Sequence, residues 1–190
     1  MGRIILQMMM TVDGYVAGPN DELDWIDNDP VMGKAHFALA ERADAAMIGH
    51  NVYQGMAAFW PQAAANPDAA DNEAEFGKLM NEMRKIVIST KPEELTWDNC
   101  EQLLVRDDDD LAGKIQEVKD GTAGYLLLYG GVQTAQTLIE RNLVDEYRLD
   151  VCPIALGAGK SIFPKRTGLK FVSATPYASG AMAVTYESTA

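Results

Sequence analysis

The chain has 190 residues, of which 47% are hydrophobic, a length and composition that suit one folded domain spanning residues 1–190. Its 28 acidic and 16 basic residues give a net charge of −12, so we expect no nucleic acid and no anionic membrane among its partners. Two cysteines are too few for a disulfide framework, no Cys or His spacing suits a metal, and no apolar stretch is long enough for a membrane span, so we expect a cytoplasmic protein without a metal.

Five apolar runs rich in β-forming residues predict strands that are buried on both faces. The runs are residues 4–10, 45–48, 85–89, 102–105 and 125–129. Helical patterns begin between or after these runs, at residues 29–30, 49–51, 71, 107–110 and 131. Because strands and helices alternate, the sequence predicts an α/β fold, a three-layer αβα sandwich with a mixed, mostly parallel central sheet.

The C-terminal part has a different pattern. Apolar and polar residues alternate in residues 147–152 and again in residues 182–186, which is typical of half-exposed antiparallel strands. The sheet is therefore expected to end in antiparallel C-terminal strands. Since an exposed alternating edge often pairs with a second subunit, we expect a homodimer.

Residues 57–72 are rich in Ala, Pro and Asn and include Trp60-Pro61. This composition predicts a mobile loop. Such a loop is either a lid over a site or a solvated insertion, and the sequence leaves both open.

Three predicted strands end in segments that suit a nucleotide. They are Gly49-His50-Asn51, Ser89-Thr90-Lys91 and the segment 129–134, in which Gly130 and Gly131 separate an apolar run from a helix. Paired glycines let backbone approach a ligand closely, and a helix N-terminus attracts phosphate. Since ligands bind at the carboxyl ends of strands in open α/β sheets, the three segments indicate a dinucleotide cradle, although a glycine pair alone also fits a tight turn without a ligand.

These segments, with several others, resemble the riboflavin-biosynthesis reductase domain family, the C-terminal domain of the riboflavin deaminase/reductase, which has the dihydrofolate reductase fold. The resemblance covers nearly the whole chain, through residues 11–18, 49–53, 89–91, 129–131, 143–149 and 153–159. The last two blocks carry the most specific pattern. The resemblance implies a reductase that takes hydride from NADPH, with NADH possible, and acts on 5-amino-6-(5-phosphoribosylamino)uracil or a related small heterocycle.

The resemblance also implies roles for particular residues. The expected cofactor-binding residues are Ala17, Gly18, Gly49, His50, Asn51, Val52, Ser89, Thr90, Lys91, Gly130, Gly131, Val132, Gln133 and Thr134. The expected substrate-binding residues are Asp13, Trp25, Phe37 and Tyr53. Asp13 is the expected catalytic residue, which grips a sugar hydroxyl or assists protonation, but Asp13-Gly14 also fits a simple turn. His36, in the middle of a predicted helix, is expected to be structural.

Two departures from the family pattern bear on the reaction. Family members commonly carry Arg, which pairs with the 2′-phosphate, and then Thr where this chain has His50 and Val52. The preference for the phosphorylated cofactor is therefore weakened unless Lys91 supplies the charge. Dihydrofolate reductases carry a carboxylate where this chain has Gly33. A dihydrofolate or pteridine reductase remains an alternative, as does a noncatalytic dinucleotide-binding protein of the same fold.

Overall fold

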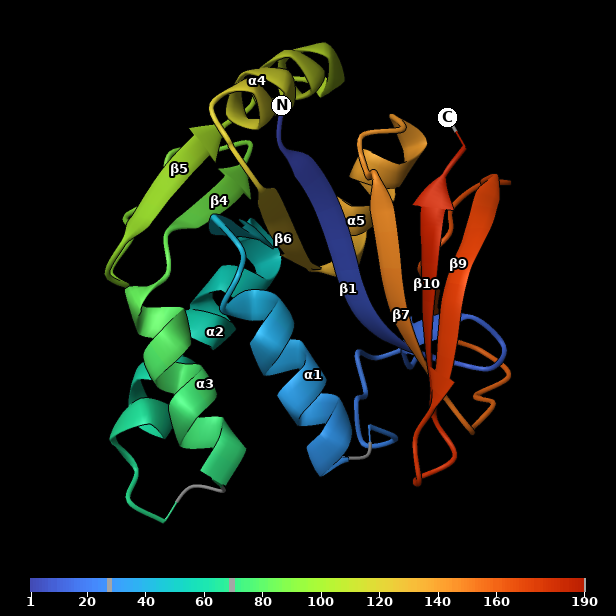
Figure 1. The fold of residues 1–190 in the computed structure, drawn as a ribbon. Coiled ribbons are helices and arrows are strands. Elements are labelled where there is room, and N and C mark those ends of the chain that lie inside the picture. Colours follow the sequence, from blue (N-terminus) through green and yellow to red (C-terminus); the bar gives the residue numbers. More distant parts are fainter. Residues whose placement is uncertain (27–28, 69–70, 190) are drawn as a thin grey trace.

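An eight-stranded mixed sheet forms the centre of the computed structural model, which describes residues 1–26, 29–68 and 71–189 (Figure 1). Its strands are β1 (Arg3–Thr11), β3 (Ala45–Gly49), β4 (Lys85–Ser89), β5 (Cys100–Leu104), β6 (Tyr125–Gly130), β7 (Glu146–Cys152), β9 (Leu169–Pro176) and β10 (Met182–Ser188). Their order is β5-β4-β3-β6-β1-β7-β10-β9, and β2 (Tyr15–Ala17) pairs with β8 (Lys160–Ser161) in a small second sheet.

The pairing confirms the predicted mixed sheet. Strands β5, β4, β3, β6, β1 and β7 pair in parallel, whereas β10 is antiparallel to both β7 and β9. The alternating residues predicted β7 and β10 as antiparallel strands, which is right for β10, whereas β7 is antiparallel to β10 and parallel to β1. The edge strand β9 was not predicted, and its side chains are mostly exposed, including Phe171 at 60%.

Helices cover both faces of the sheet. The helices α1 (Pro30–Ala40), α2 (His50–Ala65) and α3 (Asp71–Glu82) gather on one face, and α4 (Asp108–Asp120) and α5 (Val132–Glu140) belong to the other (Figure 1). Alternation along β1 divides the core accordingly: Ile4 and Leu6 pack in the cluster with α4 and α5, and Ile5 packs in the cluster with α1 to α3. No helix in the described part of the chain is long and apolar enough to cross a membrane.

The prediction of a loop at residues 57–72 is wrong for most of this range. Residues up to Ala65 continue α2, with Pro61 inside the helix, and α3 begins at Asp71, while residues 69–70 lie outside the described residues. Helix packing accounts for the difference. Trp60 lies 5.0 Å, centroid to centroid, from Phe76 of α3, and a β-carbon on Gly77 would come within 2.9 Å of the Trp60 carbonyl oxygen. The tertiary contact between α2 and α3 therefore outweighs the loop-like composition.

Candidate functional site

A cavity of about 350 Å³ lies at the carboxyl ends of β3, β4, β5 and β6. Six of the residues expected at the cofactor line it, namely His50, Asn51, Ser89, Thr90, Gln133 and Thr134. Its apolar wall includes Ile88, Val105, Leu111 and Leu138. A wall with apolar surface on one side and converging polar groups on the other is typical of a small-molecule site.

Two helices begin beside this cavity, and neither has a side-chain cap. The N-cap residues of α2 and α5 are Gly49 and Gly131, and neither helix has a side-chain hydrogen bond at its N-cap. By contrast, the carboxylate of Asp29 caps α1 and that of Asp107 caps α4. The first N–H groups of α2 and α5 are therefore available to an anion, and the helix dipoles favour one there.

Glycine allows these two helix ends to approach each other. A β-carbon on Gly49 would lie 2.9 Å from Cβ of Thr134, and one on Gly131 would lie 2.9 Å from Cγ1 of Val52. Gly130 has a φ of +88°, which side chains rarely adopt, and its peptide bond to Gly131 is cis. Across the junction, the Asn51 side-chain amide donates to Oε1 of Gln133 at 2.8 Å. The arrangement brings the backbone N–H groups that begin α2 and α5 close to each other.

Not every residue expected at the cofactor lies at this cavity. Lys91 is exposed and is not among the residues of the cavity wall; its backbone holds a turn, with its N–H donating to Oγ of Ser89 at 3.1 Å and its carbonyl accepting from the same hydroxyl at 2.7 Å. Ala17 lies in β2, where it pairs with Lys160 of β8. The N–H of Gly18 donates to the carbonyl of Glu22 at 2.9 Å.

Asp13 joins two loops. Its carboxylate accepts hydrogen bonds from Oγ1 of Thr11 at 2.5 Å and from the N–H groups of Gly157 at 2.8 Å and Leu156 at 3.3 Å. The bond from Thr11, followed by the one from Gly157, lowers the pKa of Asp13 below its ordinary value. Asp13 is therefore ionised at neutral pH, where it accepts hydrogen bonds and is a poor proton donor.

The other three residues expected at the substrate lie in different surroundings. Trp25 lines a second cavity of about 110 Å³. Phe37 of α1 packs edge-to-face against Phe76 of α3, with ring centroids 6.4 Å apart. Tyr53 differs from the expectation. Its ring is buried in the core cluster beneath α1 to α3. Its hydroxyl accepts hydrogen bonds from the backbone N–H groups of Thr96 and Trp97 at 2.9 and 3.0 Å. Tyr53 holds the segment between β4 and β5 and does not offer its hydroxyl to a substrate.

A buried polar pair between α1 and β7 was not found from the sequence. Nε2 of His36 lies 2.7 Å from Oδ2 of Asp150, whose side chain is 6% exposed. Tyr177 lies beside the same carboxylate, and burial together with Asp150 raises the pKa of Tyr177 to about 12. A histidine held by a carboxylate occurs in proton-transfer units and also as a structural contact, so the pair is a candidate for either role. The available signal was the acidic Asp150 within a half-buried strand.

Two buried polar atoms lie on the same face of the sheet as this pair. Oε1 of Gln7 and the hydroxyl of Tyr129 have no hydrogen-bond partner among the described residues. Gln7 follows Leu6 of β1 and Tyr129 follows Leu128 of β6, and Leu6 and Leu128 are paired in parallel, so the two polar side chains are neighbours. Burial raises the pKa of Tyr129, which keeps its phenol neutral. Buried polar groups are normally satisfied, so these two atoms are candidates for a polar partner that the protein itself does not supply.

The strand order, the helix layers and the cavity at the carboxyl ends of the parallel strands define a dihydrofolate reductase-like α/β protein. Dihydrofolate reductase from Enterococcus faecalis, complexed with NADP(H), has this fold: it matches with a TM-score of 0.62 at 14% sequence identity, over 100% of this chain and 98% of that chain. The chain belongs to the RibD C-terminal domain family, whose model matches residues 3–183.

Two further relatives are similar over nearly their whole length. The uncharacterized protein YyaP of Bacillus subtilis (strain 168) is 32% identical over 187 residues, which are 97% of this chain and 94% of that protein. The crystal structure of a putative riboflavin biosynthesis protein from Shewanella sp. PV-4 matches with a TM-score of 0.71 at 21% identity, over 99% of both chains. The family, together with the fold, supports a reductase of the riboflavin-pathway type.

Proposed function

We propose that this protein is a reductase that transfers hydride from a reduced nicotinamide dinucleotide to a small heterocycle, such as the ribosylaminouracil of riboflavin synthesis. The observation that carries the proposal is the cavity beside the two uncapped helix N-termini of α2 and α5. Membership of the RibD C-terminal domain family supports the reaction class.

The residues fit a dinucleotide. The N–H groups that begin α2 and α5 are available to the diphosphate, and the close approach at Gly49 and Gly131 leaves no room for a side chain that would cover them. The adenosine fits over the apolar wall that includes Ile88, Val105 and Leu111. When bound, the cofactor supplies the hydride, and the chain contributes position and the exclusion of water.

The substrate fits on the face of the sheet that α1 covers. Gln7 and Tyr129 offer an acceptor and a phenol hydroxyl to the polar edge of a heterocycle, which would satisfy both groups. The pair of His36 and Asp150 lies on the same face and is the candidate proton donor in the reduction. In this proposal Asp13 connects two loops and does not act on the substrate, because its carboxylate already accepts three hydrogen bonds.

Binding and turnover test the proposal separately. Nicotinamide fluorescence is titrated with NADH and with NADPH, and the absorbance of the reduced cofactor is then followed after the aminouracil substrate is added. We expect at least one dinucleotide to bind below about 1 mM and to be oxidised only when substrate is present. If neither binds in this range, the assignment as a reductase is wrong. Binding without turnover on any pathway intermediate would indicate the noncatalytic alternative.

A further inference from the structure

The charged groups at the nucleoside end of the cavity decide which dinucleotide fits. Among the described residues of the wall, only His50 and Asp107 have ionisable side chains, and neither lysine nor arginine is present. A 2′-phosphate brings a charge of about −1.5 to −2 and normally needs Arg or Lys, whereas an unphosphorylated ribose is held by a carboxylate on its hydroxyls.

His50 does not supply the missing positive charge. Its Nδ1 is ion-paired with Oε1 of Glu93, whose side chain is only 11% exposed. Burial opposes ionisation of Glu93, but hydrogen bonds from Ser89 and His50 outweigh this effect and hold its pKa below the ordinary value. Glu93 is therefore a carboxylate at neutral pH. Its negative charge cancels the positive charge of a protonated His50, so the pair carries no net positive charge.

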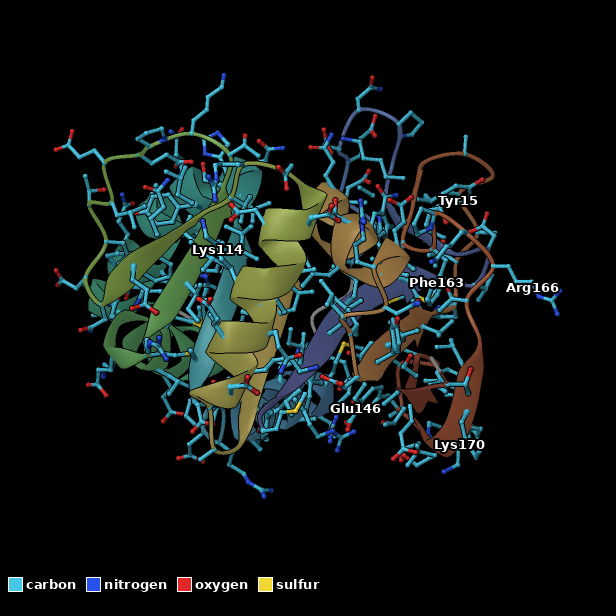
Figure 2. The ribbon with its side chains drawn as sticks, turned by 90° about the horizontal axis from the view of Figure 1, so that it is seen from above. Tyr15, Lys114, Glu146, Phe163, Arg166 and Lys170 are labelled. Atoms are coloured by element: carbon cyan, nitrogen blue, oxygen red, sulfur yellow. The ribbon has the colours of Figure 1, made fainter. Side chains whose placement is uncertain are left out.

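Two of the cations nearest in the sequence to this end of the cavity, Lys114 and Arg106, are held by other groups. Lys114 lies on the side of α4 toward β5, where its ammonium donates to the carbonyl of Leu104 and lies 3.0 Å from Oδ2 of Asp110 (Figure 2). Arg106 pairs with the same carboxylate at 3.2 Å. Lys91 is exposed and is not part of the cavity wall. Among the described residues, no Lys or Arg side chain therefore forms part of the cavity wall.

We propose that the protein uses NADH in preference to NADPH and that the pair of His50 and Glu93 determines this preference. The inference rests on the proposed function, and it reverses the cofactor preference that the family resemblance implies. The carboxylates of Glu93 and Asp107 repel a 2′-phosphate. An unphosphorylated ribose adds no charge and offers hydroxyl donors to acceptors at this end of the cavity.

Equilibrium titration of the purified full chain with NADH and NADPH tests the inference without a substrate. We expect NADH to bind at least about tenfold more tightly than NADPH. His50→Arg, which adds a permanent cation, should improve NADPH binding about tenfold, and Glu93→Gln should improve it severalfold. The matched control is Glu101→Gln, which removes one negative charge from an exposed ion pair with Arg84 outside the cavity wall and should change neither affinity.

The outcomes separate this inference from the function it rests on. If neither dinucleotide binds the wild-type protein, the proposed function fails. If NADPH binds the wild-type protein as tightly as NADH or more tightly, the reductase stands and the inference on specificity is overturned. Glu93→Gln serves as a second variant if His50→Arg lowers the thermal unfolding midpoint, and an unchanged ratio of the two affinities in a folded Glu93→Gln protein also overturns the role of the pair.

Discussion

Gly49 and Thr134 approach each other so closely that a β-carbon on Gly49 would lie 2.9 Å from Cβ of Thr134. This contact joins the end of β3 to the first turn of α5, and it brings the N-terminus of α2 to the same place. Two helix dipoles consequently meet at one point on the rim of the cavity. The proposed diphosphate site depends on this junction more than on any single side chain.

Substitution at the junction should weaken dinucleotide binding. Gly131→Val places a branched side chain against Cγ1 of Val52, so we expect binding to be lost and the protein to be destabilised by about 1–3 kcal/mol. The control is Gly113→Ala in α4, where a β-carbon meets nothing within 4 Å, and it should bind normally. Fluorescence titration and thermal unfolding of both variants check this, and full affinity in Gly131→Val would contradict the placement of the diphosphate.

Tyr53→Phe should affect stability and not the reaction. The change leaves the N–H groups of Thr96 and Trp97 without their acceptor, which costs about 1–3 kcal/mol of the free energy of unfolding. Urea denaturation measures the loss, and the KM for substrate should stay at the wild-type value. An increased KM with an unchanged unfolding midpoint would instead support a substrate-binding role for Tyr53.

Loss of the histidine of the polar pair should slow turnover. We expect His36→Gln to reduce kcat by about 10²- to 10⁴-fold, because the proton source on the substrate face is removed, and to leave dinucleotide affinity unchanged. Lys34→Gln, an exposed change in the same helix, is the control. A variant with wild-type kcat would leave His36 as a packing residue only.

Asp13 should contribute to stability in a pH-dependent way. Because its folded-state pKa lies below its ordinary value of 3.8, the contribution is complete above that pH and is lost as the pH falls through the lower folded-state value. Asp13→Asn should therefore lower the unfolding midpoint at neutral pH, and the difference from wild type should shrink as the pH falls below 3.8. If the difference in unfolding midpoint between Asp13→Asn and wild type does not change with pH, the hydrogen-bonding role is contradicted. If Asp13→Asn loses turnover but keeps wild-type stability, a catalytic role is favoured instead.

The exposed edge of the sheet is the proposed dimer contact. Strand β9 lies at the end of the sheet and exposes Phe171 and Val172, at 60% and 48%, so a second copy can cover its apolar side chains. Light scattering should give the mass of a dimer for the wild-type protein and of a monomer for Phe171→Glu. A monomeric wild-type protein would show that this edge stays unpaired.

The sequence predicted the elements whose patterns are local. Apolar runs located five of the six strands that pair in parallel, β7 was located by its alternating residues, and the Asp29-Pro30 cap located the start of α1. The prediction failed where packing between distant segments decides the structure. The alanines between Ala57 and Ala65 favour a helix and were outweighed in the prediction by Pro61, while the packing of α3 at Gly77 could not be predicted from the local sequence.

The features of the site also divide into those with a local sequence signal and those without one. Glycines at strand ends and the polar residues that follow them are local signals, and His50, Ser89 and Gln133 do lie at one cavity. The pairing of His50 with Glu93 and of His36 with Asp150 joins residues 43 and 114 positions apart. Only the fold brings such pairs together, so neither the proposed charge at the nucleoside end nor the proposed proton donor could be predicted from the sequence.

The most direct test of the central claim is a crystal structure of the complex with NADH. We expect the diphosphate to accept hydrogen bonds from the backbone N–H groups that begin α2 and α5, with the adenosine over Ile88 and Leu111. A diphosphate bound elsewhere, or a cavity closed by side chains with the dinucleotide on another surface, would contradict the account.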